Sequence, residues 1–446
     1  MRPGSLAVSL ILVLAAGMAS AAHAAQDLLQ IWRAALASDP LYAAARANYR
    51  ASIEQLPQAR ADLLPAVNAE IIGGYDETRA TRNISSRARD GSRAGWGLVL
   101  SQPLYDGSRW QRYEQARLGV ADAELQLQQA YQDLLLRVAD AYFNVLAAQD
   151  TLAATEGEKA AVAAQLEAAK RNFELGNATI TDTYEAQARY DLIVAQELLQ
   201  QNTLTVLRDE LAKIIGQQPG ALAELPAGVR LPPPQPARMA DWSTQAESAS
   251  LAVARAQLQT QIAQREIQVA RSGHYPTLSL RATSGSAEGQ HREAAGGRAI
   301  DSSIGLVLSV PIYSGGGVSS QVTEKVQLQQ KAREDYEAAR RQAVQEARQY
   351  YTGVVSGLAR IAALEAGENS SRAAVQANQT GYEIGVRINL DVLNAQQQLY
   401  ATQRDLAQAR YRTLLDGLRL KAVGGILAEA DLEAINRMLR LPAPGR

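Results

Sequence analysis

The chain has 446 residues, a formal net charge of -1 and no cysteine, and aromatic residues make up only 5% of it. Its high content of Ala, Gln, Leu, Glu and Arg suits long helices better than compact cores. The nearly balanced charge gives no reason to expect a nucleic-acid partner. Three histidines and no cysteine nearly exclude nucleophile–base pairs and histidine metal sites, so we expect no enzymatic activity, metal or cofactor.

The N-terminus has the parts of a secretory signal peptide: Arg2, an apolar run over 6–16, and Ala22-His23-Ala24 before Ala25. We expect residues 1–24 to be removed on export. An uncleaved anchor helix is the alternative, but the apolar run is shorter than the ~20 residues that span a bilayer. No later segment has 18 consecutive apolar residues, so strands are expected to make any membrane crossing.

Two parts of the chain repeat each other. PLYDG at 103–107 corresponds to PIYSG at 311–315, an offset of 208 residues. FELGNATITDTYEAQ at 173–187 corresponds to YEIGVRINLDVLNAQ at 382–396, an offset of 209. Two landmarks that keep nearly the same register indicate a duplicated unit. Each copy contains a long stretch without proline that an unbroken helix can occupy, and the sequence LPPPQP between the copies is typical of a linker.

These signals predict a signal peptide at 1–24 and a first repeat at 25–215, with a helix, a β-hairpin at about 65–105, a long helix at 108–175 and a helix at 180–215. A linker segment is expected at 216–241. A second repeat follows at 242–424, with a helix, a β-hairpin at about 276–313, a long helix at 317–384 and a helix at 390–424, and a C-terminal segment occupies 425–446.

The long helices carry a coiled-coil seam. A helix over 108–175 would be about 100 Å long at ~1.5 Å per residue, more than a soluble globule of this size needs. Apolar residues alternate along it at steps of three and four, the spacing of a left-handed coiled coil. The seam residues are Tyr131, Leu134, Val138, Ala141, Val145, Ala148 and Leu152 in the first copy, and Val344, Ala347, Tyr351, Val354, Leu358 and Ile361 in the second.

The segment before each long helix alternates with period two, which predicts two hairpins with one apolar face each. The alternating residues are Val67, Ala69, Ile71, Trp96, Leu98 and Leu100 in the first copy, and Leu278, Leu280, Ala282, Ile304, Leu306, Leu308, Val310 and Ile312 in the second. We expect the polar segments 76–93 and 288–301 to be outward loops. Four strands cannot close a barrel around a lumen, so several protomers must share one.

Three aromatic residues lie where strands give way to long helices. Tyr105, Trp110 and Tyr313 occupy the level at which an aromatic girdle would meet lipid headgroups. The alternative is that they fill a joint between strand and helix. Gly315-Gly316-Gly317 lacks the Lys and Ser/Thr of a phosphate-binding loop, and a flexible joint is its simpler role.

The chain resembles the TolC family of outer-membrane channel proteins over nearly its whole mature length. The motifs that carry the resemblance are DLLQIWRAALASDP at 27–40, LLP at 63–65, ADAYFNVLAAQD at 139–150, FELGNATITD, YEIGVRINLDVLNAQQQLY and LAEADLEAIN at 427–436. The resemblance implies a mostly α protein with a membrane β-barrel. Three protomers would each give four strands to a twelve-stranded barrel in the outer membrane, and their helices would form a periplasmic α-barrel. The linker and C-terminal segments would form an equatorial domain.

The resemblance also implies a passive duct for type I protein secretion or small-molecule efflux. Its expected partners are a periplasmic adaptor protein, an inner-membrane pump of the ABC or RND type, the lipid bilayer and the exported protein or small molecule. By motif position, Asp391 matches an aspartate ring at the periplasmic constriction, and Arg387 and Tyr382 match links to Asp182 of the first repeat. Asn394 stands where family members often carry a second acid, so one acidic ring is expected.

Two other functions fit parts of the pattern. An adaptor of the same export machines also carries long helical hairpins, but it needs a lipoyl-like β domain that is not visible here. A periplasmic coiled-coil structural protein without a channel would explain the seams. It would not explain two hairpins with apolar faces.

Overall fold

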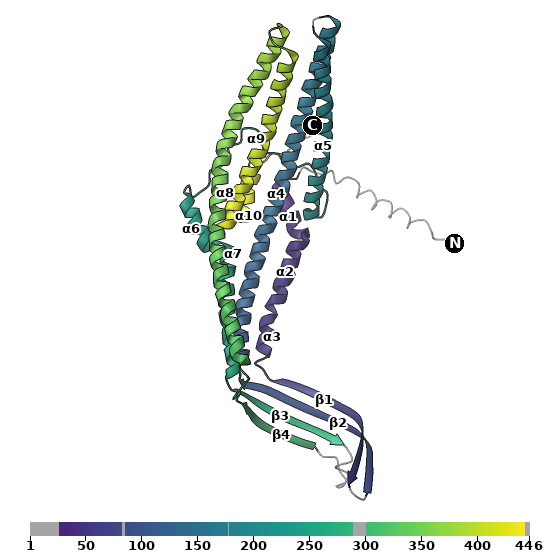
Figure 1. Ribbon diagram of the computed structural model, residues 1–446, viewed down its shortest axis with the longest axis vertical. Coiled ribbons are helices and arrows are strands. Elements are labelled where there is room, and N and C mark those ends of the chain that lie inside the picture. Colours follow the sequence, from purple (N-terminus) through teal and green to yellow (C-terminus); the bar gives the residue numbers. More distant parts are fainter. Residues whose placement is uncertain (1–25, 83–84, 177, 289–299, 442–446) are drawn as a thin grey trace, which may run out of the picture. The chain divides into compact units, whose positions relative to one another are not determined.

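The computed structural model describes residues 26–82, 85–176, 178–288 and 300–441 (Figure 1). The expected signal peptide lies outside these residues. The chain forms two units, one of residues up to 45, 128–251 and from 340 on, the other of 46–127 and 252–339. The long helices α4 (Gly107–Glu174) and α8 (Gly317–Glu383) contribute residues to both units. No described helix has an apolar stretch long enough to cross a bilayer.

The first unit is built on two helical hairpins. Helix α4 turns back into α5 (Ile180–Ile215), and α8 turns back into α9 (Asn389–Val423) (Figure 1). Helix α5 ends at Gly216, whose φ of 74° is the left-handed conformation that terminates a helix and that glycine adopts without strain. Ion pairs link the helices, including Lys159–Glu197 at 2.6 Å and Arg404–Glu158 at 2.8 Å.

The other described α-helices are shorter: α1 (Leu28–Ser38), α2 (Pro40–Ile53), α3 (Gln55–Ala61), α6 (Met239–Ala249), α7 (Leu251–Arg271) and α10 (Glu429–Asn436). A single 3-10 turn, η1 (Ser272–His274), follows α7. Helix α1 begins at Asp27, whose side chain accepts from the backbone N–H of Gln30 at 2.7 Å. This bond satisfies one of the backbone donors that every helix start leaves unpaired.

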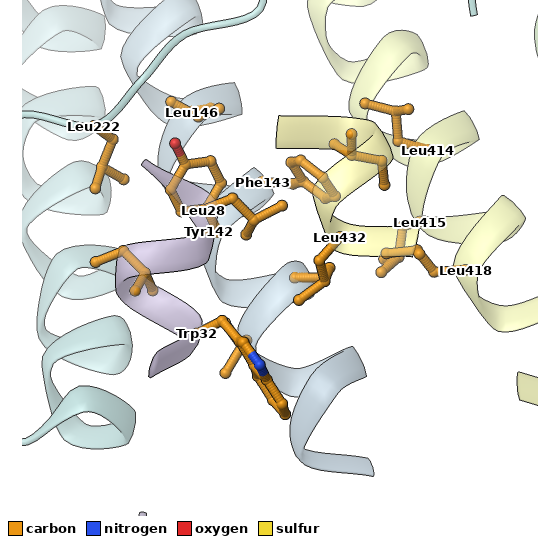
Figure 2. Close-up of a cluster of buried hydrophobic side chains, with 14 of the residues drawn as sticks. Leu28, Trp32, Tyr142, Phe143, Leu146, Leu222, Leu414, Leu415, Leu418 and Leu432 are labelled. Carbon is orange, nitrogen blue, oxygen red and sulfur yellow. The ribbon is translucent and has the colours of Figure 1, made fainter. Parts of the chain in front are cut away.

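The main hydrophobic core of this unit gathers α1, α4, α9 and α10 (Figure 2). Trp32, Tyr142, Phe143 and Leu432 are no more than 2% exposed. The seam residues Leu134, Val138 and Val145 are fully buried in the same core, as the coiled-coil pattern predicts. The cluster joins side chains of both hairpins to α1 and α10, so the burial of apolar surface here holds these elements together.

Three distant parts of the chain pair beside this core. Gln26 pairs in parallel with Leu222, and Glu224 pairs in antiparallel fashion with Arg440. These bridges join the beginning of the described chain, the expected linker at 216–241 and the expected C-terminal segment at 425–446. They form a small mixed assembly around the hairpins, of the kind that the resemblance implies for an equatorial domain.

The second unit holds a four-stranded antiparallel sheet in the order β1-β2-β3-β4 (Figure 1). Its strands are β1 (Ala66–Arg82), β2 (Ser85–Tyr105), β3 (Thr277–Glu288) and β4 (Ile300–Ser309). In the same unit, parts of α4 and α7 are linked by the Arg255–Asp122 ion pair at 3.4 Å. The prediction that residues 76–93 form a loop is wrong, because strand β1 continues to Arg82 and strand β2 begins at Ser85, and the two are paired over this length. Backbone hydrogen bonds extend a hairpin whatever the polarity of its side chains.

The apolar side chains of the sheet stand in rows across all four strands. Val67 pairs with Leu100, Leu100 with Ala282 and Ala282 with Ile304. The face is open in the single chain, since Ile71 is 90% exposed and Ile304 is 75% exposed. These rows confirm the alternation predicted within the strands, but Val310 and Ile312, expected on the same strand face, lie beyond the end of β4 at Ser309. The mostly helical chain with one antiparallel sheet confirms the predicted fold class.

Candidate functional site

The candidate site lies at the tips of the two hairpins of the first unit. Each tip contains a glycine in the left-handed conformation, Gly176 with φ of 76° and Gly385 with φ of 79°. At the second tip the backbone N–H groups of Val386 and Arg387 both donate to the carbonyl of Gly381, at 2.9 and 3.1 Å. A Cβ on Gly381 would lie 2.7 Å from Cγ of Arg387, so a larger residue here would force the Arg387 side chain to move.

Asp182 is held by the start of its own helix. Its Oδ2 accepts from the backbone N–H and from the hydroxyl of Thr179, each at 3.0 Å. The backbone N–H of Asp182 donates in return to the Thr179 hydroxyl at 3.4 Å. This capping box fixes the first turn of α5 and points the carboxylate at the tip.

Arg387, two residues before α9, lies close to Asp391 in the first turn of that helix. Nη1 of Arg387 lies 3.7 Å from Oδ2 of Asp391, and the two side chains are 58% and 37% exposed. Tyr382, at the end of α8, accepts from Nδ2 of Asn172 on α4 at 3.2 Å. Within one chain the tyrosine is thus linked to Asn172. The links of Tyr382 and Arg387 to Asp182 that the resemblance implies remain a prediction.

Asn394 is linked to the first hairpin through a residue that the sequence pattern did not single out. Arg189 of α5 donates to Oδ1 of Asn394 at 3.2 Å and to Oε1 of Gln397 at 2.8 Å. The fully buried Asn389 was also missed. A signal for it exists in the sequence, since a polar residue stands at a seam position of α9 where an apolar residue is expected.

The aromatic residues expected at a membrane interface lie in the second unit. Tyr105 ends β2, Trp110 lies in the first turn of α4 and Tyr313 follows β4. They are 52%, 54% and 87% exposed in the single chain. Trp110 contacts the ring of Tyr113 with centroids 6.0 Å apart. The side chain of Tyr313 is the most exposed of the three. Exposed aromatic side chains with a polar tip suit a membrane interface, and their girdle role remains a prediction.

Comparison with known proteins identifies the family. The family model described as outer membrane efflux protein matches residues 31–217 and 242–425. The chain belongs to the outer membrane efflux protein family. The two matched segments contain the two hairpins and the two strand pairs, in agreement with the internal repeat. They also contain all five candidate residues at the tips, Asp182, Tyr382, Arg387, Asp391 and Asn394.

Similarity to individual members of the family extends over nearly the whole chain. Outer membrane protein TolC of Vibrio cholerae is 32% identical over 96% of this chain and 97% of its own. The alkaline protease secretion protein AprF of Pseudomonas aeruginosa is 32% identical over 92% of this chain and 87% of its own. The solved structure of the outer membrane protein VceC of Vibrio cholerae superposes with a TM-score of 0.75 at 20% identity, over 89% of this chain and 96% of that one.

These similarities confirm the resemblance to TolC and show that the chain is an outer-membrane export channel protein reaching into the periplasm. They do not favour an adaptor or a coiled-coil structural protein. The family is one of channels rather than enzymes.

Proposed function

We propose that three copies of this chain close one barrel of twelve strands and form a passive exit duct across the outer membrane and into the periplasm. The observation that carries the proposal is the open sheet. One face of the sheet exposes apolar side chains such as Val67, Ile71 and Ile304, and among the described residues β1 and β4 each pair on one side only.

Physical reasons favour closure by further copies. An unpaired strand edge in lipid leaves backbone N–H and C=O groups without partners, which costs several kcal/mol for each group. Four strands are too few to enclose a lumen by themselves. The opposite face carries polar side chains such as Asn68, Glu70 and Thr283, which suit a water-filled interior.

The same arrangement supports a passive role at the periplasmic entrance. Three copies would bring three Asp391 carboxylates around one axis, with Arg387, Tyr382 and Asp182 linking neighbouring hairpins. In this proposal the energy comes from an inner-membrane pump of the ABC or RND type, joined through a periplasmic adaptor, and the channel itself performs no catalysis. Because Asn394 carries no charge, the three Asp391 side chains would form the one acidic ring of this entrance.

Type I protein secretion is the first candidate pathway. It is supported by the 32% identity to a protein named for alkaline protease secretion. Small-molecule efflux is the second candidate, supported by the efflux description of the matching family.

The test begins with the detergent-extracted outer-membrane fraction, run on gels with and without boiling. We expect a heat-sensitive band at three times the mass of the mature chain, and discrete conductance steps when the unboiled species is added to planar bilayers. A mature chain that stays a water-soluble monomer and never enters lipid would contradict the proposal.

A further inference from the structure

Asn389 is a buried polar residue at the tip of the second hairpin. It is the first residue of α9 and is 0% exposed. It begins the buried face of this helix, which continues through Leu393 and Gln396 at steps of four and three. Leu393 belongs to an apolar cluster with Val162 and Leu166 of α4, which lie three residues before and one residue after Gln165. The Asn389 amide thus lies next to an apolar part of the seam.

The side chain of Asn389 bonds to both helices of the other hairpin. Its Oδ1 accepts from Nε2 of Gln165 on α4 at 2.6 Å. Its Nδ2 donates to the backbone carbonyl of Asp182 on α5 at 3.1 Å. Gln165 is itself only 8% exposed. One amide therefore joins α4, α5 and α9 at the point where both hairpins turn, and we call these two bonds the amide clasp.

The amide clasp differs in kind from the other polar contacts between α4 and α9. Arg404 with Glu158, Tyr411 with Asp150 and Arg419 with Asp140 each include a carboxylate. Among the described residues, Asn389 with Gln165 is the side-chain pair between these helices without a formal charge. Two amides that must meet in an apolar seam tolerate little sliding, because a shift of one turn would leave both buried without partners.

A buried asparagine in a coiled-coil seam is known to fix register at some cost in stability. We propose that Asn389 is a positioning residue which sets the axial register of the α8–α9 tip against the α4–α5 tip, and that release of the amide clasp is a step in opening the entrance. The second part rests on the proposed channel function, while the first does not.

The key variant replaces both amides by leucine, Gln165→Leu with Asn389→Leu. Removing both partners leaves no unpaired side-chain amide, so stability should change little. The Asp182 carbonyl lies in the first turn of α5, where it can still accept a hydrogen bond from the backbone N–H four residues later in the helix. A variant with the two amides exchanged, Gln165→Asn with Asn389→Gln, keeps the total length of the pair and should restore the register. Gln396→Leu is the matched control, since Gln396 is also buried in the seam at 3% exposure but its Oε1 has no partner among the described residues.

Register can be measured without any channel activity. The chain has no cysteine, so Glu174→Cys and Glu383→Cys place spin labels on the exposed ends of α4 and α8. Distances are recorded by electron double resonance with the labelled chain diluted in unlabelled chain. We expect one narrow distance in the parent, in the exchanged pair and in Gln396→Leu. In the double leucine variant a second distance should appear, with the shifted-to-unshifted ratio about tenfold higher, equivalent to about 1.4 kcal/mol.

The outcomes separate the two parts of the inference. A double leucine variant with the parent distance distribution would overturn the register role, and so would an exchanged pair that fails to restore it. If the distance shifts but the open probability in planar bilayers does not rise, the opening step is wrong. If the parent protein gives no conductance at all, the proposed channel function fails, while the spin-label distances still decide the register role.

Discussion

The guanidinium of Arg387 and the carboxylate of Asp391 lie one helical turn apart at the start of α9, with Nη1 3.7 Å from Oδ2. The contact is long and exposed, so it contributes at most about 0.5 kcal/mol to one chain. Both groups keep hydrogen-bonding capacity that a neighbouring copy can use. Because the loss of this contact should hardly change the stability of the chain, an entrance role for Arg387 can be tested by measuring channel conductance.

We expect Arg387→Ser combined with Tyr382→Phe to raise single-channel conductance in planar bilayers, because the pair links neighbouring hairpins in the proposed closed entrance. The thermal midpoint should stay within a few degrees of the parent. Arg372→Ser is the matched control. Arg372 is equally exposed at 58% and also pairs with a carboxylate one turn away, Glu368 at 2.6 Å, but it lies within α8 and outside the tip turn. An unchanged conductance in the double variant would show that Arg387 and Tyr382 do not hold the entrance.

Thr179→Ala should loosen the first turn of α5. The substitution removes the hydroxyl that accepts from the Asp182 backbone N–H and donates to its carboxylate. Loss of a side-chain cap costs about 1 kcal/mol, so amide hydrogen exchange in residues 181–183 should be roughly fivefold faster. Thr179→Ser keeps the hydroxyl and should exchange at the parent rate. Equal exchange in the alanine and serine variants would mean that the cap does not stabilise the tip.

Leu432→Ala should destabilise the contact of α10 with the main core. Leu432 is 0% exposed, and such truncations cost about 2–5 kcal/mol through lost burial and the cavity left behind. Leu441→Ala removes the same atoms from a side chain that is 59% exposed, and its effect should stay within about 0.5 kcal/mol. Thermal unfolding of the detergent-solubilised protein compares the two. A similar loss of Tm in both variants would contradict the assignment of Leu432 to the core.

The pair of Asp39 and Arg137 should make the first unit sensitive to acid. Burial of the Asp39 carboxyl pushes its pKa upward, but two bonds from Arg137 at 3.0 Å and one from the Tyr42 backbone N–H outweigh it and hold the pKa below its usual value. The folded-state pKa therefore lies below the unfolded one. The stabilisation from this carboxylate is fully present above pH ~4 and is lost as pH falls through the folded pKa.

Asp39→Asn should accordingly cost about 1–3 kcal/mol at pH 6 and progressively less as the pH falls below ~4. Thermal midpoints of the parent and the variant across this range measure the difference. A gap between them that stays constant down to pH 3 would show that the carboxylate does not carry the acid sensitivity.

Local patterns in the sequence predicted most of the architecture. The expected long helix at 108–175 corresponds to α4 at Gly107–Glu174, and the expected helix at 180–215 corresponds to α5 at Ile180–Ile215. Periodicity predicts such bounds because the hydrogen bonds of a helix join residues four apart. The hairpin β1–β2 extends further than its apolar pattern, since strand pairing uses the backbone and leaves no mark in the side chains.

The sequence by itself determined that this chain forms long seamed helices and a sheet with one apolar face, because both follow from the spacing of apolar residues along a helix or strand. The partners of the polar residues at the tips were decided only by tertiary structure. Tyr382 meets Asn172 and Asn389 meets Gln165 across more than 200 residues of chain. Such contacts depend on how two helical hairpins pack, and packing selects one neighbour among many side chains of equal hydrogen-bonding capacity.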